Sequence, residues 1–263
     1  MDESRLSPIV EKLEKKIKEL WKGLDLESRK KIKKKSGFRD IVTDADYQME
    51  NWLKSYVNEL LPEASFLGEE TKEVTRGELL WILDPIDGTT NFSRMNPHFS
   101  TSISLVDKDR VLLGVTYDPS TNEMFTAVKN QGAYLNGKQI HTSNINKLTE
   151  CSAHTGLQYS SSKSYQRLCS RISKAINKCR ALRITGSACL DLCYVSAGRA
   201  EVFWEEQLKP WDVAAGIILV QEAGGSISSC LNESFDLFNP NIYATNGNPK
   251  ITDDFYREIL NND

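Results

Sequence analysis

The sequence lacks the features that define several large classes of protein. Its longest apolar run covers residues 213–220, far short of the roughly 20 residues of a membrane-spanning helix, and the N-terminus is polar, unlike a signal sequence. Lysine plus arginine (33) nearly balance aspartate plus glutamate (36), and the net charge of −3 excludes a nucleic-acid binder that relies on bulk positive charge. We find no internal repeat and no low-complexity linker. We therefore expect a cytoplasmic chain with no membrane partner.

The cysteines and histidines also lack informative spacing. None of the six cysteines forms a C-x-x-C pair, and all of them follow residue 150 in segments that we predict to be buried. Without a signal sequence we expect reduced thiols and no disulfides. The three histidines, His98, His141 and His154, are not spaced like metal ligands, and we interpret them as polar or core residues.

Hydrophobic periodicity predicts two halves of mixed secondary structure. In residues 1–145, the patterns indicate helices over 10–24 and 44–61, the second capped by Thr43 and ended by Pro62. A mostly antiparallel sheet follows over 79–140, with a hairpin at Asn136–Gly137. In residues 146–263, strands alternate with helices predicted over 165–177, 187–197 and 212–223. The 263 residues therefore read as two α+β halves that share one interface.

A short basic run interrupts the first half. Six of the seven residues from Arg29 to Lys35 are lysine or arginine. Such a run can mark a nucleic-acid patch, but we favour a solvated helix end or a flexible loop.

Two carboxylates follow the short apolar run at residues 79–83. Asp84 ends the predicted strand, and Pro85 lacks an N–H donor and turns the chain, so that Asp87 returns to within a few Å of Asp84. Two buried carboxylates repel each other unless a cation lies between them, and oxygen-only ligands favour Mg²⁺ over Ca²⁺ or Zn²⁺. The alternative is that these two residues merely cap the turn.

Acidic residues elsewhere favour the metal interpretation. Glu69 and Glu70 follow the apolar pair Phe66–Leu67, a predicted strand, and Asp212 starts an apolar helix, either as its N-cap or as a metal ligand. A calcium-sensor loop would need its acids within about twelve consecutive residues, so these dispersed acids can meet only through folding.

The acidic segments carry a family resemblance. Gly-Glu-Glu at 68–70, DPIDGTTNF at 84–92 and WDVAAG at 211–216 resemble the inositol monophosphatase family of magnesium-dependent, lithium-sensitive phosphomonoesterases, and residues 40–46, 186–188 and 222–225 agree with it. The resemblance implies an α+β fold, a layered αβαβα sandwich shared with fructose bisphosphatase, and a homodimer.

The resemblance also implies a role for each matching residue. Two to three Mg²⁺ ions would be held by Glu69, Asp84, the carbonyl of Ile86, Asp87 and Asp212, with Glu70 in support. The catalytic residues would be Thr89 and Asp46, which orient the attacking water, and Glu69. The substrate would be bound by Asp87, Gly88, Thr89, Gly186, Ser187, Ala188, Glu205 and Asp212.

We therefore expect Mg²⁺-dependent hydrolysis of a phosphate monoester by metal-activated water, with myo-inositol monophosphate as the first candidate substrate. Fructose bisphosphate, histidinol phosphate and phosphoadenosine phosphate are alternatives, because relatives with the same motifs act on them. A regulator that binds RNA or polymerase with the same fold is a less favoured alternative, supported only by the basic run. Glu206 adds charge beside Glu205, and we expect one of these two side chains to be solvated.

Overall fold

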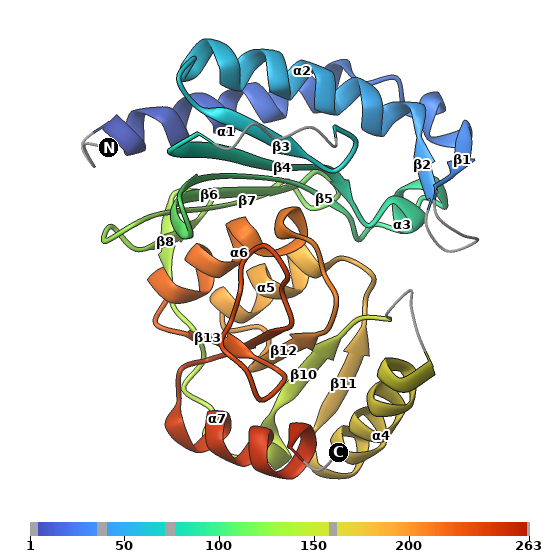
Figure 1. Cartoon of the computed structure of the whole chain (residues 1–263), viewed down its shortest axis with the longest axis vertical. Helices are drawn as coiled ribbons and strands as arrows, with labels where there is room; N and C mark the ends of the chain where they lie inside the picture. Colours follow the sequence, from blue (N-terminus) through green and yellow to red (C-terminus); the bar gives the residue numbers. More distant parts are fainter. Residues whose placement is uncertain (1–4, 36–40, 72–76, 158–161, 262–263) are drawn as a thin grey trace.

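The structure, a computed structural model, describes residues 5–35, 41–71, 77–157 and 162–261. It has five layers (Figure 1). Helices α1 (Leu6–Gly23) and α2 (Asp44–Leu60) cover a seven-stranded sheet, α5 (Ala188–Ser196) and α6 (Pro210–Glu222) lie between the two sheets, and α4 (Ser162–Lys178) and α7 (Pro249–Phe255) cover a five-stranded sheet. The predicted αβαβα sandwich is confirmed.

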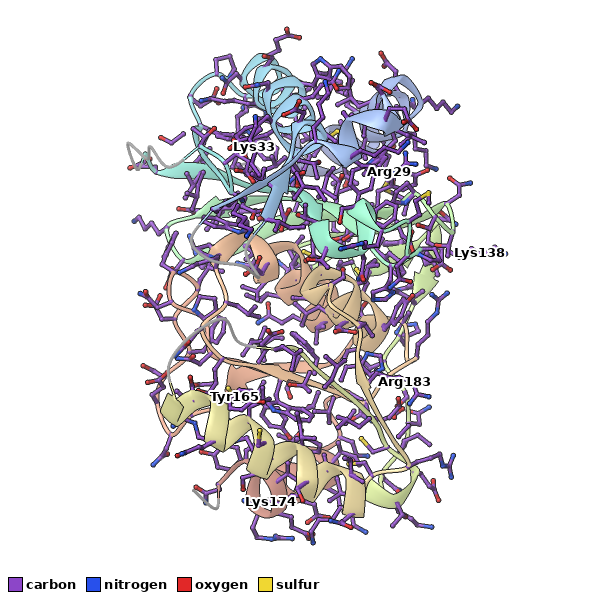
Figure 2. All side chains as sticks on the ribbon, turned by 90° about the vertical axis from the view of Figure 1, so that its right-hand side faces the viewer. Arg29, Lys33, Lys138, Tyr165, Lys174 and Arg183 are labelled. Atoms are coloured by element: carbon purple, nitrogen blue, oxygen red, sulfur yellow. The ribbon has the colours of Figure 1, made fainter. Side chains whose placement is uncertain are left out.

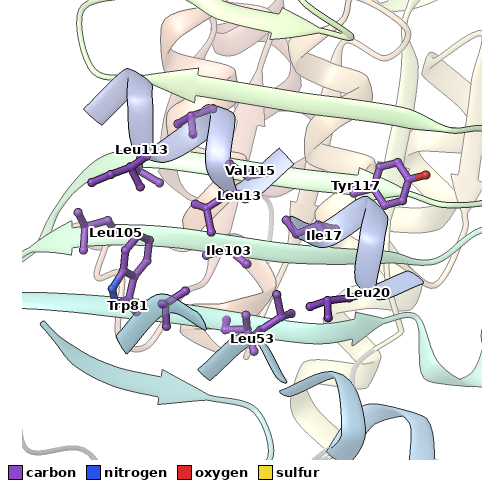
Figure 3. Packing of buried hydrophobic residues seen from close by; sticks show 14 of the residues in the cluster. Leu13, Ile17, Leu20, Leu53, Trp81, Ile103, Leu105, Leu113, Val115 and Tyr117 are labelled. Carbon is purple, nitrogen blue, oxygen red and sulfur yellow. The ribbon is translucent and has the colours of Figure 1, made fainter. Parts of the chain in front are cut away.

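The outer helices form because their apolar residues recur on one face. Leu13 and Ile17 of α1 are fully buried and pack over Leu113 and Val115 of the seven-stranded sheet (Figure 3). Helix α2 begins as predicted, because the Thr43 backbone N–H donates to the side chain three residues later. None of the helices in the described part of the chain is long and apolar enough to cross a membrane.

The seven-stranded sheet has the order β3-β4-β5-β6-β7-β8-β9. Its strands are β3 (Ser65–Gly68), β4 (Leu79–Asp87), β5 (Ser100–Asp107), β6 (Arg110–Asp118), β7 (Glu123–Val128), β8 (Ala133–Leu135) and β9 (Lys138–Ile140). All neighbours are antiparallel except β3 and β4, and Asn136–Gly137 turns β8 into β9 with positive φ at both residues, as predicted. The parallel pair matters most, because it brings the C-terminal ends of β3 and β4 to one edge.

The five-stranded sheet has the order β11-β10-β12-β14-β13. Its strands are β10 (Ser152–Thr155), β11 (Ala181–Ile184), β12 (Val202–Glu205), β13 (Ser226–Ser229) and β14 (Ile242–Thr245). Strand β10 is parallel to both β11 and β12, so the C-terminal ends of these three strands share an edge. Since the chain passes from one sheet to the other between β9 and β10, we propose the boundary between the two halves near residue 145.

The basic run begins at the end of a short helix and is solvated, as one of the two favoured interpretations predicts, but it continues into a strand and not into a flexible loop. It forms the 3₁₀ helix η2 (Leu26–Lys30) and strand β1 (Ile32–Lys34), which pairs with β2 (Ile41–Thr43). The remaining short elements are α3 (Thr89–Ser93), the 3₁₀ helix η3 (Leu148–Glu150) and the π-helix η4 (Tyr256–Leu260). Asp40, in the motif segment 40–46, lies outside the described residues.

The prediction that all cysteines are buried is wrong for two of them. Cys169 lies on the solvent face of the amphipathic helix α4 and is exposed, and Cys179, just after this helix, is half-buried. All six thiols are free.

Gly114 in β6 sets the distance between the seven-stranded sheet and α6. A Cβ at this position would lie 2.7 Å from the carbonyl oxygen of Ala215, which is backbone and cannot move aside. We expect Gly114→Ala to lower the free energy of unfolding by about 1–3 kcal/mol in urea denaturation. Gly23→Ala is the matched control, because a Cβ there meets nothing within 4 Å, and it should change stability by less than about 0.5 kcal/mol. Equal effects of the two substitutions would contradict this view of the packing.

Candidate functional site

Strands β3 and β4 deliver three carboxylates to one edge of the seven-stranded sheet. Gly68 pairs with Leu83, and the Glu69 N–H donates to the Leu83 carbonyl oxygen at 3.2 Å. Glu69 therefore lies beside Asp84 of the neighbouring strand, and Glu70 follows it in the chain. The motif residues meet here because parallel strands end at the same edge.

A β-bulge brings Asp84 and Asp87 together. Asp84 is opposite Ser102 and Asp87 is opposite Ser100, so three steps along β4 match two steps along β5. The extra residue restores the side-chain alternation that three steps would otherwise invert. As a result, carboxylate oxygens of the two aspartates lie within 4.8 Å of each other, which confirms the predicted return of the chain.

Asp84 has the environment expected of a metal ligand. It is only 2% exposed, and its Oδ1 is buried without a hydrogen-bond partner among the described residues. Burial raises the pKa of Asp84 well above its usual range, and the nearby carboxylates of Glu69, Asp87 and Asp212 raise it further. A buried, unpartnered carboxylate oxygen is costly, and a hard cation is the partner that its chemistry fits.

Asp87 is fixed by the other half of the chain. Its Oδ2 accepts hydrogen bonds from the Ser187 hydroxyl and, at 2.9 Å, from the Cys189 backbone N–H at the start of α5. Burial raises the pKa of Asp87 to about 7, although both hydrogen bonds favour its ionised form. Ser187, predicted to bind substrate, is buried here and directs its hydroxyl to this carboxylate.

Asp212 reaches the same cluster from α6. The helix begins at Pro210, so Asp212 is its third residue and not its N-cap; the N-cap interpretation is wrong. Its Oδ2 accepts a hydrogen bond from the Lys209 backbone N–H at 2.7 Å, which fixes the side chain at the helix start. Burial raises the pKa of Asp212, and the carboxylates of Asp87 and Glu69 add to this increase.

Lys35, at the end of the basic run, contacts two acidic residues of the site. Its ammonium group lies 2.7 Å from Glu69 Oε1 and also contacts the carboxylate of Glu70. Burial raises the pKa of Glu70 to about 7. On the other side, the Glu70 N–H donates to Glu50 Oε2 at 2.8 Å, and this close approach needs Gly68, where a Cβ would lie 2.4 Å from the same oxygen.

The predicted water-orienting pair is in contact. The Thr89 hydroxyl oxygen lies 3.1 Å from Asp46 Oδ1 and 3.0 Å from the Ile86 carbonyl oxygen. Asp46 is fully buried, and burial raises its pKa to about 6. Gly88, before α3, adopts a φ of +84°, and a Cβ there would lie only 3.0 Å from the His98 carbonyl oxygen and 3.1 Å from that of Gly186.

The segments near Gly186 and Glu205 follow strands of the five-stranded sheet, in the second half of the chain. Asn91 Nδ2 donates to the Thr185 carbonyl oxygen at 2.9 Å and so ties α3 to the turn that contains Gly186, ahead of Ala188 at the start of α5. Glu205, at the end of β12, is 9% exposed, and burial together with the carboxylate of Asp212 raises its pKa.

The expectation that Glu205 or Glu206 is solvated is wrong. Glu206 is 2% exposed because it turns away from Glu205 toward α4. There it accepts hydrogen bonds from Arg167 Nε at 2.8 Å and Arg171 at 2.7 Å. The histidine interpretation is supported at His154, whose Nδ1 lies 2.6 Å from Asp191 Oδ1 in a buried pair.

Comparisons with known proteins show the family of this chain. The chain belongs to the inositol monophosphatase family, whose sequence model matches residues 5–262. It is 39% identical over 217 residues to Nus factor SuhB of Escherichia coli K12, covering 82% of this chain and 80% of the relative. It is 37% identical over 217 residues to fructose-1,6-bisphosphatase/inositol-1-monophosphatase of Thermotoga maritima, covering 82% of each chain. Among solved structures, extragenic suppressor protein suhB of Bartonella henselae matches with a TM-score of 0.88 and 30% identity, covering 98% of this chain and 100% of that one.

Proposed function

We propose that this chain hydrolyses a phosphate monoester with Mg²⁺, and that myo-inositol monophosphate is its first candidate substrate. The observation that carries the proposal is the cluster of Asp84, Asp87 and Asp212, in which the first two side chains are buried, the third is half-buried, and Asp84 Oδ1 has no hydrogen-bond partner among the described residues. These residues, with Glu69 and the Ile86 carbonyl oxygen, would hold two to three Mg²⁺ ions. Mg²⁺ bound there would lower the pKa of a bound water and stabilise charge on the leaving oxygen.

Thr89 and Asp46 are placed to handle the proton of the attacking water. One oxygen of Asp46 accepts the hydrogen bond from the Thr43 backbone N–H, and the other faces the Thr89 hydroxyl. A water that donates to Thr89 Oγ1 can therefore pass its proton through the hydroxyl to Asp46. Because burial raises the pKa of Asp46 to about 6, this carboxylate is ionised near neutral pH and is still able to accept that proton.

The phosphate and the alcohol of the substrate would be bound by different segments of the chain. The N–H groups of Gly88 and Thr89 lie at the start of α3, where helical N–H groups have no partner within the helix. Gly186, Ala188 and the buried carboxylate of Glu205 come from the second half of the chain and would bind hydroxyl groups of a polyol. A polyol phosphate therefore suits the site better than a long hydrophobic ester. Fructose bisphosphate remains the main alternative, because the printed name of the Thermotoga relative joins both activities.

Phosphate release from a substrate panel tests this function. We expect turnover of myo-inositol 1-phosphate in Mg²⁺, loss of turnover in EDTA, and slower release from histidinol phosphate and phosphoadenosine phosphate. Fructose 1,6-bisphosphate in the same assay decides between the two leading substrates. No release from any of these esters in Mg²⁺ would overturn the proposed function.

A regulatory role in transcription is the second candidate, because the Escherichia coli relative is named a Nus factor. The basic run supports it weakly, since five of its six cations have acidic partners in this chain: Arg29 and Lys30 pair with Glu27, Lys31 and Lys33 with Asp44, and Lys35 with Glu69. Arg29 and Lys33 lie at the surface of the first half (Figure 2). These five cations share three carboxylates, so part of the charge of the run is balanced within the chain, and we favour the enzyme. The homodimer, the lithium sensitivity and the cytoplasmic location stay predictions.

A further inference from the structure

A cysteine thiol lies within the acidic cluster. Cys189 is the second residue of α5, and its Sγ and one carboxylate oxygen each from Asp84 and Asp87 all lie within 4.8 Å of one another. All three side chains are buried. No motif considered above assigns a role to this thiol.

The thiol is held in place by the backbone that also fixes Asp87. The Cys189 N–H donates to Asp87 Oδ2 at 2.9 Å, so the start of α5 sets the position of both potential ligands. The Sγ lies 3.3 Å from the Asp212 carbonyl oxygen, a weak contact that a thiol can give up. The Sγ also lies 3.7 Å from the Trp211 carbonyl oxygen, and the thiol therefore borders the cluster in a fixed position with weak contacts to these two carbonyl groups.

An independent observation indicates that this space takes a ligand. Asp84 is 2% exposed and belongs to the same three-residue group, and nothing in the described part of the chain makes a hydrogen bond to its Oδ1. Mg²⁺ and Ca²⁺ prefer oxygen ligands and gain nothing from sulfur, whereas Zn²⁺ and Co²⁺ bind thiolate and carboxylate together. Two carboxylates and one sulfur form a three-ligand set that leaves a further position open.

We propose that Asp84, Asp87 and Cys189 form a binding site for a thiophilic divalent cation of the zinc class, and that this cation competes with Mg²⁺ for the two aspartates. Binding exchanges the thiol proton for the metal ion, and the proton leaves to solvent, so no redox partner is needed. The inference deepens the proposed function because both ions use the same aspartates. Thiolate coordination, however, can be measured without any turnover.

Cobalt spectroscopy on the full-length, EDTA-treated chain tests the proposal. We expect Co²⁺ to produce a near-ultraviolet thiolate-to-cobalt charge-transfer band that saturates at one ion per chain and decreases when Zn²⁺ or excess Mg²⁺ is added. Cys189→Ser should lose the band, and its Zn²⁺ affinity in calorimetry should fall at least about tenfold more than its Mg²⁺ affinity. Cys193→Ser is the matched control, because it removes another buried thiol one turn later in α5 and should keep the band.

Absence of the band from the wild-type chain would overturn the proposal, as would its persistence in Cys189→Ser. If the serine variant does not fold by circular dichroism, Cys189→Ala takes its place, and the wild-type spectrum alone still decides. A band without hydrolysis of any ester would overturn the proposed function and leave this site standing. Hydrolysis of an ester without a charge-transfer band would support the proposed function and overturn the thiolate site.

Discussion

Asp87→Asn is expected to reduce Mg²⁺-dependent phosphate release by at least about 10³-fold, equivalent to about 4 kcal/mol of transition-state stabilisation. The amide has nearly the same shape but carries no charge, and a neutral oxygen is a poor ligand for Mg²⁺. It can still accept the hydrogen bonds from Ser187 and from the Cys189 N–H, so we expect the fold to persist. Initial rates at saturating substrate over a Mg²⁺ titration would measure the loss.

Asp254→Asn provides the control for this substitution. Asp254 lies in α7, on the outer layer, where it pairs with Arg257, so the same chemical change is made away from the cluster. We expect its activity to remain within about twofold of wild type and its circular dichroism spectrum to match. An Asp87→Asn enzyme with normal turnover would show that the metal assignment is wrong.

Removal of magnesium should make the stability of the protein fall as pH rises from about 4 to about 7. In the metal-free protein, burial raises the pKa of Asp87 to about 7, of Glu70 to about 7 and of Asp46 to about 6, whereas their unfolded values lie near 4. Between these limits the folded state binds more protons than the unfolded state, so the free energy of unfolding decreases as the pH rises. The stabilisation from these protonated carboxyls is present below about pH 4 and is lost as the pH rises through about 7.

Magnesium should oppose this trend, because it binds the ionised carboxylates of the folded state only. At a hundredfold excess over its dissociation constant it would add about 2.7 kcal/mol. Thermal unfolding in EDTA and in Mg²⁺ at pH 5 and pH 8 tests the prediction. We expect the difference in Tm between the two conditions to be larger at pH 8. A difference that is equal at both pH values would argue against carboxylate ligands, and Asp87→Asn should reduce it.

Much of the fold could be predicted because local patterns agreed with tertiary packing. The predicted helix at 44–61 matches α2 (Asp44–Leu60), whose start depends on the contact between Thr43 and Asp46. Asp84 and Asp87 could be paired from sequence because Pro85 lies between them and forces the chain to turn. The signal in these cases lies within a few residues of its effect.

The features that the sequence did not reveal depend on contacts between distant segments. Lys35 meets Glu69 and Glu70 only because β1 pairs with β2, and a run of lysines carries no sign of which one turns inward. Cys189 seemed an ordinary apolar position of α5, since its place beside Asp84 follows from the docking of α5 onto the seven-stranded sheet at β5 and β6. Family motifs identified the acidic residues and were silent about this neighbouring thiol.

Because Ser187 and Cys189 donate hydrogen bonds to Asp87, the geometry of the acidic cluster depends on the contact between the two halves of the chain. Asp84 and Asp87 come from the seven-stranded sheet, but the groups that orient Asp87 come from α5. Any opening between them would leave the carboxylate without its two donors and lower its affinity for a cation. By linkage, the free energy with which a bound ion favours the closed arrangement equals the affinity that opening would remove. A bound metal ion should therefore hold the two halves together, and contact between the halves should raise the affinity for the ion by the same free energy.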